Sequence, residues 1–190
     1  MNKIVAIVGM AGSGKSVLAD KLVEAGFTFI RFGQITLDIV KERGLEPTED
    51  NEKKAREEVR RKCGMGAYAI LNMPKIKEAL KKGNVVVDNL LSWSEYKILR
   101  QEYGDKLVVV AVYSPPELRY KRLTERKLLP SDKSIRNRPA TFEDAKKRDY
   151  NEIENIEKGG PIVMADFTLQ NIGTMKDFEK QIAKLINKVL

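Results

Sequence analysis

Short apolar runs alternate with longer amphipathic stretches along the whole chain. Five runs rich in β-branched and aromatic residues predict strands at 3–8, 27–31, 84–88, 107–113 and 167–170. Helical periodicity separates them, and it is most regular from Met175 to Val189, where apolar residues recur at three- and four-residue steps. Because apolar strands that alternate with helices form parallel βαβ units, the pattern predicts an α/β sandwich with helices on both faces of the sheet.

Glycine and proline set the expected bounds of the helices. We expect the first helix to end at Gly26, a charged helix over 51–62, and a further helix through Pro74 to Lys82. The helix that Thr141 caps is expected to end at the Gly-Gly-Pro sequence of 159–161. Two long excursions between strands, at about 33–82 and about 128–140, predict an acceptor-binding insertion and a lid within one domain of residues 1–190.

A glycine-rich loop follows the first predicted strand. It matches the pattern G-x-x-x-x-G-K-S with the residues Gly9, Met10, Ala11, Gly12, Ser13, Gly14, Lys15 and Ser16. Such a loop turns successive N–H groups toward one phosphate, and the helix that follows adds the positive end of its dipole. Lys15 is expected to neutralise the β- and γ-phosphates, and Ser16 to supply a hydroxyl to Mg²⁺. With the adjoining Val17, these residues form the predicted ATP-binding segment.

An acid and a group of arginines complete the predicted site. Asp88 ends a strand of three valines, so we expect it at the carboxyl edge of the sheet, where it could hold Mg²⁺ or cap the next helix. Between 117 and 138, eight basic residues stand against three acidic ones. Cations around a transferring phosphoryl group stabilise its transition state. Catalytic roles beside those of Lys15 and Asp88 are therefore predicted for Arg122, Arg126 and Arg138, and a nucleotide contact for Arg119.

Composition narrows the classes of function. The chain has 190 residues, 42% hydrophobic and 33% charged, and no apolar run approaches the ~18 residues of a membrane-spanning helix. It has no histidine, which excludes histidine-based acid–base catalysis. The single cysteine, Cys63, cannot form an internal disulfide, so a cytoplasmic setting is expected. The net charge of +8 indicates an acidic partner, and its concentration near the phosphate site favours a nucleotide over nucleic acid.

These motifs resemble those of the nucleoside-monophosphate-kinase-like branch of P-loop kinases over essentially the whole chain. The similarity extends from the loop to Phe32-Gly33, to Ser114-Pro115 with Arg119 and Arg122, and to Ala165-Asp166-Phe167 before Asn171 and Gly173. Archaeal proteins similar to dephospho-coenzyme A kinases and adenylate kinases look closest. The resemblance implies five parallel strands in the order 2-3-1-4-5 and Mg²⁺-dependent transfer from ATP. It also implies that Asn171 and Gly173 flank the adenine.

Departures from the family pattern leave the acceptor open. Gln34 and Leu37 stand where these kinases often have Asp and Arg, and Asn89 follows the strand acid in place of Gly. A nucleoside monophosphate requires positioning and cations, which Arg56, Arg60 or Arg61 could supply. A ribose hydroxyl benefits from a carboxylate base, and that base would have to be Asp88 or Asp38.

The sequence therefore predicts an ATP- and Mg²⁺-dependent phosphotransferase that acts on a nucleotide or a small phosphorylated acceptor, without a membrane partner. One alternative is transfer to a ribose hydroxyl, as in dephospho-coenzyme A kinases. Another is an ATP-dependent binding module or weak ATPase with no small-molecule acceptor. A switch GTPase is disfavoured because no N-K-x-D guanine signature occurs.

Overall fold

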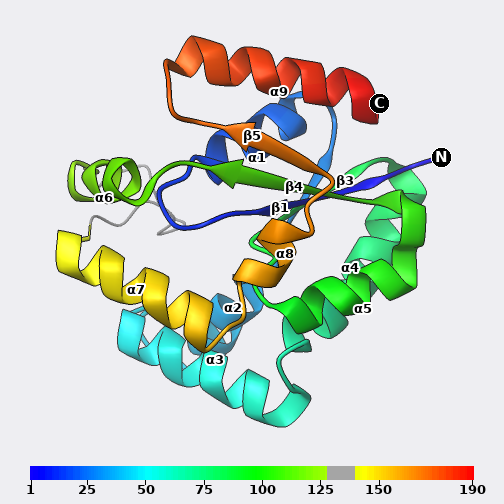
Figure 1. Ribbon diagram of the computed structural model, residues 1–190. Coiled ribbons are helices and arrows are strands. Elements are labelled where there is room, and N and C mark those ends of the chain that lie inside the picture. The colour runs from blue at the N-terminus through cyan, green and yellow to red at the C-terminus, as the bar shows by residue number, and fades with distance from the viewer. Residues whose placement is uncertain (128–139) are drawn as a thin grey trace.

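The computed structural model of the protein describes residues 1–127 and 140–190. The strands of these residues form one sheet, in which neighbours pair in parallel in the order β2-β3-β1-β4-β5 (Figure 1). They are β1 (Ile4–Val8), β2 (Thr28–Arg31), β3 (Val85–Asp88), β4 (Leu107–Tyr113) and β5 (Phe167–Gln170). The predicted parallel α/β sandwich with strand order 2-3-1-4-5 is confirmed.

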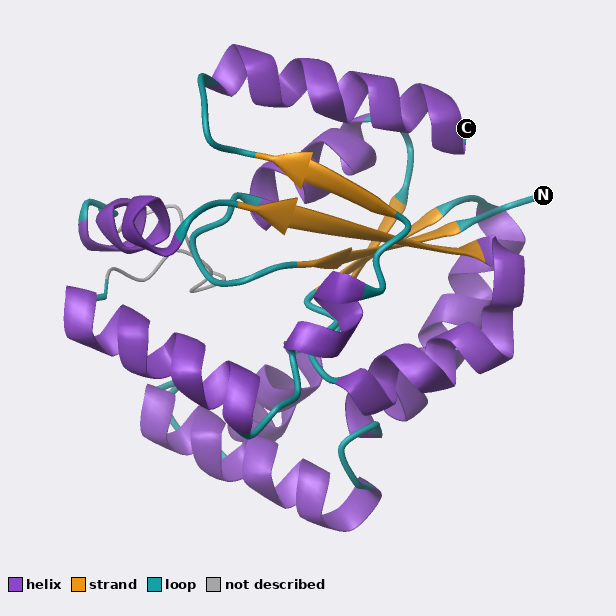
Figure 2. Ribbon diagram, in the orientation of Figure 1, coloured by secondary structure: helices purple, strands orange, loops and turns teal. Residues whose placement is uncertain are grey.

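Two layers of helices enclose the sheet (Figure 2). One face is covered by α1 (Lys15–Glu24) and α9 (Met175–Val189), and the other by α4 (Ala67–Lys82), α5 (Trp93–Tyr103) and the short α8 (Gly159–Val163). Successive residues of β1 enter opposite cores: Val5 lies in the core that contains Phe178 of α9, and Ala6 in the core that contains Leu99 of α5. Because both faces of β1 and β3 are buried, these strands contain no alternating polar positions before Asp88.

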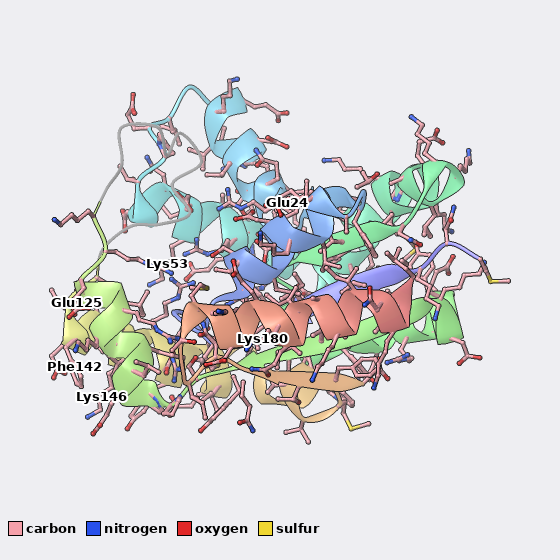
Figure 3. All side chains as sticks on the ribbon, turned by 90° about the horizontal axis from the view of Figure 1, so that it is seen from above. Glu24, Lys53, Glu125, Phe142, Lys146 and Lys180 are labelled. Atoms are coloured by element: carbon pink, nitrogen blue, oxygen red, sulfur yellow. The ribbon has the colours of Figure 1, made fainter. Side chains whose placement is uncertain are left out.

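The remaining helices lie around the carboxyl ends of the strands. Within the predicted acceptor-binding insertion, α2 (Gln34–Glu42) packs against α3 (Glu49–Cys63). At the other side, α6 (Pro116–Thr124) packs against α7 (Phe142–Glu154), with Phe142 edge-on to the Tyr120 ring at 5.0 Å. Figure 3 shows exposed Glu125 and Lys146 on the outer rim of this pair. A single 3-10 turn at Gly104–Lys106 leads into β4. Among the described helices, none is long and apolar enough to cross a bilayer.

Two helices differ from their predicted bounds by more than a few residues or by a change of neighbouring structure. α4 begins at Ala67 and contains Pro74, which was expected near its start, because buried residues such as Ala67 and Ile76 anchor both halves to the core. α7 ends at Glu154, and the Gly-Gly-Pro sequence expected to close it instead begins α8. Tertiary packing explains the second error, since Gly160 lies directly against the Trp93 ring of α5. The predicted lid at about 128–140 falls almost entirely outside the described residues.

The packing of α8 on α5 can be tested with two neighbouring glycines. A Cβ at Gly160 would lie 2.8 Å from the Trp93 ring, whereas a Cβ at Gly159 would meet no atom within 4 Å. We expect Gly160→Ala to lower the free energy of unfolding by about 1–3 kcal/mol relative to Gly159→Ala. The Trp93 ring is stacked on Tyr96, so it has little room to move away from the added methyl group. Urea denaturation of both variants measures the difference, and equal midpoints would contradict this packing.

Candidate active site

The loop from Gly9 to Ser16 joins β1 to α1 at the carboxyl edge of the sheet. Gly9 and Gly14 have backbone φ angles of 137° and 102°, which residues other than glycine rarely adopt. A Cβ at Gly9 would collide with the carbonyl oxygen of Val112, and one at Gly14 with the side-chain amide of Asn171. The loop backbone therefore depends on glycine at both positions, as the motif predicts.

The N-terminus of α1 is open to an anion. Its N-cap is Gly14, which makes no side-chain capping hydrogen bond, and its first turn contains no acidic residue. Hydroxyl side chains cap four other helices: α3, α5, α7 and α9. Since the first N–H groups of a helix lack intrahelical acceptors, those of α1 can bind phosphate together with the dipole.

Arg119 of α6 holds the loop backbone by a hydrogen bond. Its guanidinium donates to the carbonyl oxygens of Ala11 at 3.1 Å and Ser114 at 3.0 Å, and to the Asp149 carboxylate at 2.6 Å. The Tyr120 hydroxyl also donates to Asp149, at 3.0 Å. Only 4% of Arg119 is exposed. In this structure the residue predicted to touch the nucleotide fixes the loop backbone, and it ties α7 to α6.

Asn171 and Arg122 brace the loop from the side of β5. The Asn171 amide donates to the carbonyl oxygen of Ser13 at 2.9 Å. Arg122 donates to the carbonyl oxygen of Asn171 at 3.0 Å and to the Ser114 hydroxyl at 2.9 Å, and partial burial lowers its pKa. Gly173, two residues further along this segment, is exposed.

Lys15 is folded into the site rather than extended into solvent. Its Nζ donates to the carbonyl oxygen of Met10 at 3.0 Å. Burial and, after it, the positive charge of Lys158 lower the pKa of Lys15 to about 7, although Asp88 and Glu152 act in the opposite direction. An ammonium group held in these surroundings gains stability when an anion arrives beside it.

Asp88 and Ser16 offer oxygen ligands at the same edge. Asp88 is 8% exposed at the end of β3, where it pairs with Ile7 of β1. Its negative charge acts to raise the pKa of Lys15. Ser16 is half-buried in the first turn of α1. In the described part of the chain no three His, Cys, Asp or Glu residues gather as a metal cage. A carboxylate and a hydroxyl alone suit Mg²⁺, which takes its remaining ligands from phosphates and water.

A second group of polar residues lies between the insertion and α5. The Arg60 guanidinium lies 5.6 Å from the centre of the Tyr68 ring, and its buried Nε and Nη2 have no hydrogen-bond partner among the described residues. Glu95 is fully buried and uses Oε2 to accept from the backbone N–H groups of Leu91 and Ser92, while its Oε1 has no partner there. Burial raises the pKa of Glu95 to about 7.

The other predicted residues differ in their surroundings. Val17 packs partly against the core under α1, and Arg126 is half-buried just after α6. Arg138 lies outside the described residues. Of the three arginines considered for the acceptor, Arg61 is exposed, Arg56 lies 3.6 Å from Glu52, and Arg60 lies over the Tyr68 ring.

Sequence analysis did not predict a functional role for Glu95 or for Lys158, which is buried and forms an ion pair with Glu152. Glu95 was visible only as the last residue of a Ser-x-x-Glu capping box, which is a structural pattern. Lys158 precedes two glycines in a stretch without periodicity. Its place near Lys15 depends on the tertiary fold, which positions the turn between α7 and α8 close to the phosphate loop.

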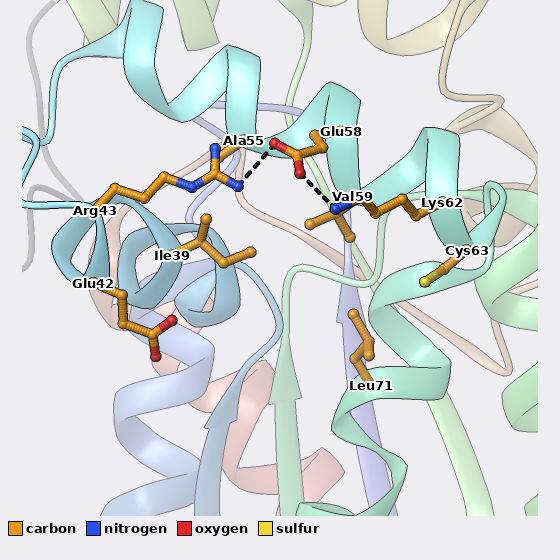
Figure 4. A pocket seen from close by; sticks show the side chains of 9 residues that line it. All are labelled: Ile39, Glu42, Arg43, Ala55, Glu58, Val59, Lys62, Cys63 and Leu71. Atoms are coloured by element: carbon orange, nitrogen blue, oxygen red, sulfur yellow. Dashed lines mark hydrogen bonds and ion pairs between the residues drawn. The ribbon is translucent and has the colours of Figure 1, made fainter.

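A cavity of about 350 Å³ lies within the insertion, between α2, α3 and α4 (Figure 4). Ile39, Val59 and Leu71 line it, and exposed Cys63 lies at its side. Glu58 on its wall accepts from Arg43 at 2.8 Å and from Lys62 at 2.7 Å. None of the phosphate-loop residues lines this cavity.

Comparison with known proteins supports a P-loop assignment. A family model described as an AAA domain matches residues 5–143. A UPF0200 protein of Thermococcus gammatolerans is 34% identical over 189 residues, which cover 98% of this chain and 95% of that protein. The fold is shared with a shikimate kinase from Bacteroides thetaiotaomicron (12% identity, TM-score 0.59, 98% of each chain). It is also shared with a gluconokinase from Sinorhizobium meliloti (16% identity, TM-score 0.55, 99% of this chain and 95% of that one).

The resemblance to P-loop kinases is confirmed at the level of the fold, whereas these relatives give no support to a closer link with dephospho-coenzyme A kinases. The glycine loop, the open helix terminus and the strand order agree with the family match. The chain belongs to the AAA domain family of P-loop NTPases and to the UPF0200 proteins.

Proposed function

We propose that this protein is a phosphotransferase that moves the γ-phosphoryl group of ATP to a small phosphorylated acceptor of the nucleotide type. One observation carries the proposal: Lys15, in a glycine loop at an uncapped helix terminus, shares its surroundings with the strand-end Asp88. A phosphoryl group in transfer needs positioning and positive charge, and this edge supplies both.

The chain's own residues divide the work of the transfer. Loop N–H groups and Lys15 bind the β- and γ-phosphates, and the braces from Arg119 and Asn171 keep the loop from rearranging. Bound Mg²⁺, held by Ser16 and Asp88, would neutralise charge on the phosphate oxygens. Arg122, Arg126 and Arg138 remain candidates for contact with the transferring group.

Arg60 supports a phosphorylated acceptor over an uncharged one. Two of its donors are buried without partners in the described structure, and such donors are costly unless a ligand satisfies them. The neighbouring Tyr68 ring is anchored by a 2.6 Å hydrogen bond between its hydroxyl and Thr36. Arg60 and Lys158 each act to lower the pKa of the buried Glu95, so these three charged groups lie in one region of the protein.

Replacing the loop lysine tests the nucleotide site. We expect Lys15→Met to weaken ATP binding at least tenfold in the presence of Mg²⁺, because the ammonium group faces the β- and γ-phosphates. Calorimetric titration measures the loss. Lys21→Met, at the exposed end of the same helix where Lys21 pairs with Glu24, is the control and should bind as the unmodified protein does. Equal affinities for both variants would refute the assignment of Lys15.

The depressed pKa of Lys15 predicts a pH dependence. The free protein has a Lys15 pKa of about 7, with Lys158, Arg148, Asp88 and Glu152 as its charged neighbours, and bound phosphates raise that pKa. Below pH 7 Lys15 is protonated in both states, so affinity is unaffected. Above pH 7 binding must take up a proton, so affinity falls by up to about tenfold per pH unit. Calorimetry at pH 8 in buffers of different ionisation enthalpy should register this uptake, and Lys15→Met should abolish it.

The acceptor is tested by ADP release over a panel of nucleoside monophosphates and dephospho-coenzyme A. We expect a phosphorylated acceptor to stimulate turnover, and Arg60→Met to raise its KM about ten- to a hundredfold while leaving ATP affinity unchanged. Arg61→Met, one residue away and exposed, is the matched control. An unchanged KM in Arg60→Met would contradict the acceptor assignment. If no compound of the panel stimulates ADP release although the protein still binds ATP, the result would favour an ATP-driven binding module.

A further inference from the structure

The turn between α7 and α8 brings a buried lysine to the phosphate loop. Lys158 is 1% exposed, and its Nζ lies 2.5 Å from Oε2 of Glu152, which is itself 5% exposed. Asp149, one turn before Glu152 on α7, is joined to the loop through Arg119, which donates both to this carboxylate and to the carbonyl oxygen of Ala11. The ammonium group of Lys158 lies near enough to Lys15 to lower its pKa, an effect second to that of burial. Lysine is among the residues least often fully buried, so this position requires a physical reason.

Stability alone does not supply that reason. Removing two charges from water costs several kcal/mol per ion, and well-packed apolar residues often stabilise a fold as well as a buried ion pair does. The positive charge of Lys158 also repels that of Lys15 in the same poorly solvated region and so lowers the pKa of Lys15. Two ammonium groups at one centre are unfavourable until an anion lies between them.

The surroundings of Glu152 allow Lys158 to exchange partners. Arg148, one turn earlier on α7, donates from Nε to Oε1 of Glu152 at 2.9 Å, so the carboxylate keeps a cationic partner if Lys158 turns away. The backbone at Lys158 is fixed independently: its N–H donates to the carbonyl oxygen of Glu152 at 3.1 Å. Glu157, just before it, has a left-handed φ of 56°, a strained conformation of the kind found at functional sites.

We propose that Lys158 is a second phosphate-binding lysine, which leaves Glu152 for the γ-phosphate oxygens when ATP binds. The proposal rests on the proposed function, since it assumes a triphosphate at the loop. Glu152 then holds Lys158 in the free protein and stays paired with Arg148 in the complex. The step is an exchange of ion-pair partners and breaks no covalent bond.

Calorimetry with ATP and ADP, each with Mg²⁺, tests the exchange. A contact with the γ-phosphate predicts that Lys158→Met loses about ten- to a hundredfold in ATP affinity and little in ADP affinity. Lys158→Arg, which keeps the charge, should recover part of the preference for ATP. Lys147→Met, an exposed lysine on α7, is the control and should behave as the unmodified protein. A purely structural lysine would change the two affinities equally or leave both unchanged.

A double variant protects the test against misfolding. If Lys158→Met alone does not fold, the variant with both Lys158→Met and Glu152→Leu removes the buried carboxylate as well and is judged by the same two titrations. Selective loss of ATP affinity in the folded variant supports the proposal. A ratio of ATP affinity to ADP affinity equal to that of the unmodified protein overturns it. Failure of the unmodified protein to bind either nucleotide would instead refute the proposed function.

Discussion

The concentration of positive charge at one poorly solvated edge of the sheet is the constraint on which the site depends. Lys15 and Lys158 lie there with the open terminus of α1. Burial first, and the charge of Lys158 after it, lower the pKa of Lys15, and Asp88 and Glu152 offset this only in part. An arrangement of this kind is costly in the free protein and is relieved by a polyanion. The same edge is therefore unfavourable when empty and well suited to bind phosphate.

Hydrogen bonds from several elements hold the loop in its conformation despite this unfavourable charge. Arg119 and Asn171 bond to loop carbonyl oxygens from α6 and from the segment after β5, and Ser114 after β4 joins the two braces. Part of the basic cluster predicted as a source of catalytic charge is therefore used to hold the loop. Arg119 is committed to the protein's own backbone, while Arg60, far from that cluster in sequence, keeps donors without protein partners in the described structure.

The sequence predicted those parts of the fold that depend on local pattern. Apolar strands, the glycine loop and the position of Asp88 follow from periodicity and from a motif whose backbone requires glycine, and the strand order followed from the family resemblance. The errors arose where distant contacts decide. Trp93 shapes the environment of Gly160, so a sequence read as a helix end begins a helix. Lys158 and Glu95 acquire significance only from neighbours far along the chain, which no local pattern encodes.

The central claim is that the amides of the first loop bind a triphosphate, and backbone NMR tests it most directly. Titration of the full chain with ATP and Mg²⁺ should shift the amide resonances of Gly12, Gly14, Lys15 and Ser16 most strongly, because their N–H groups would gain phosphate acceptors. Adenosine at the same concentration should leave these resonances in place. If ATP shifts none of them, or perturbs only the cavity residues near Val59, the loop does not bind the nucleotide and the account fails.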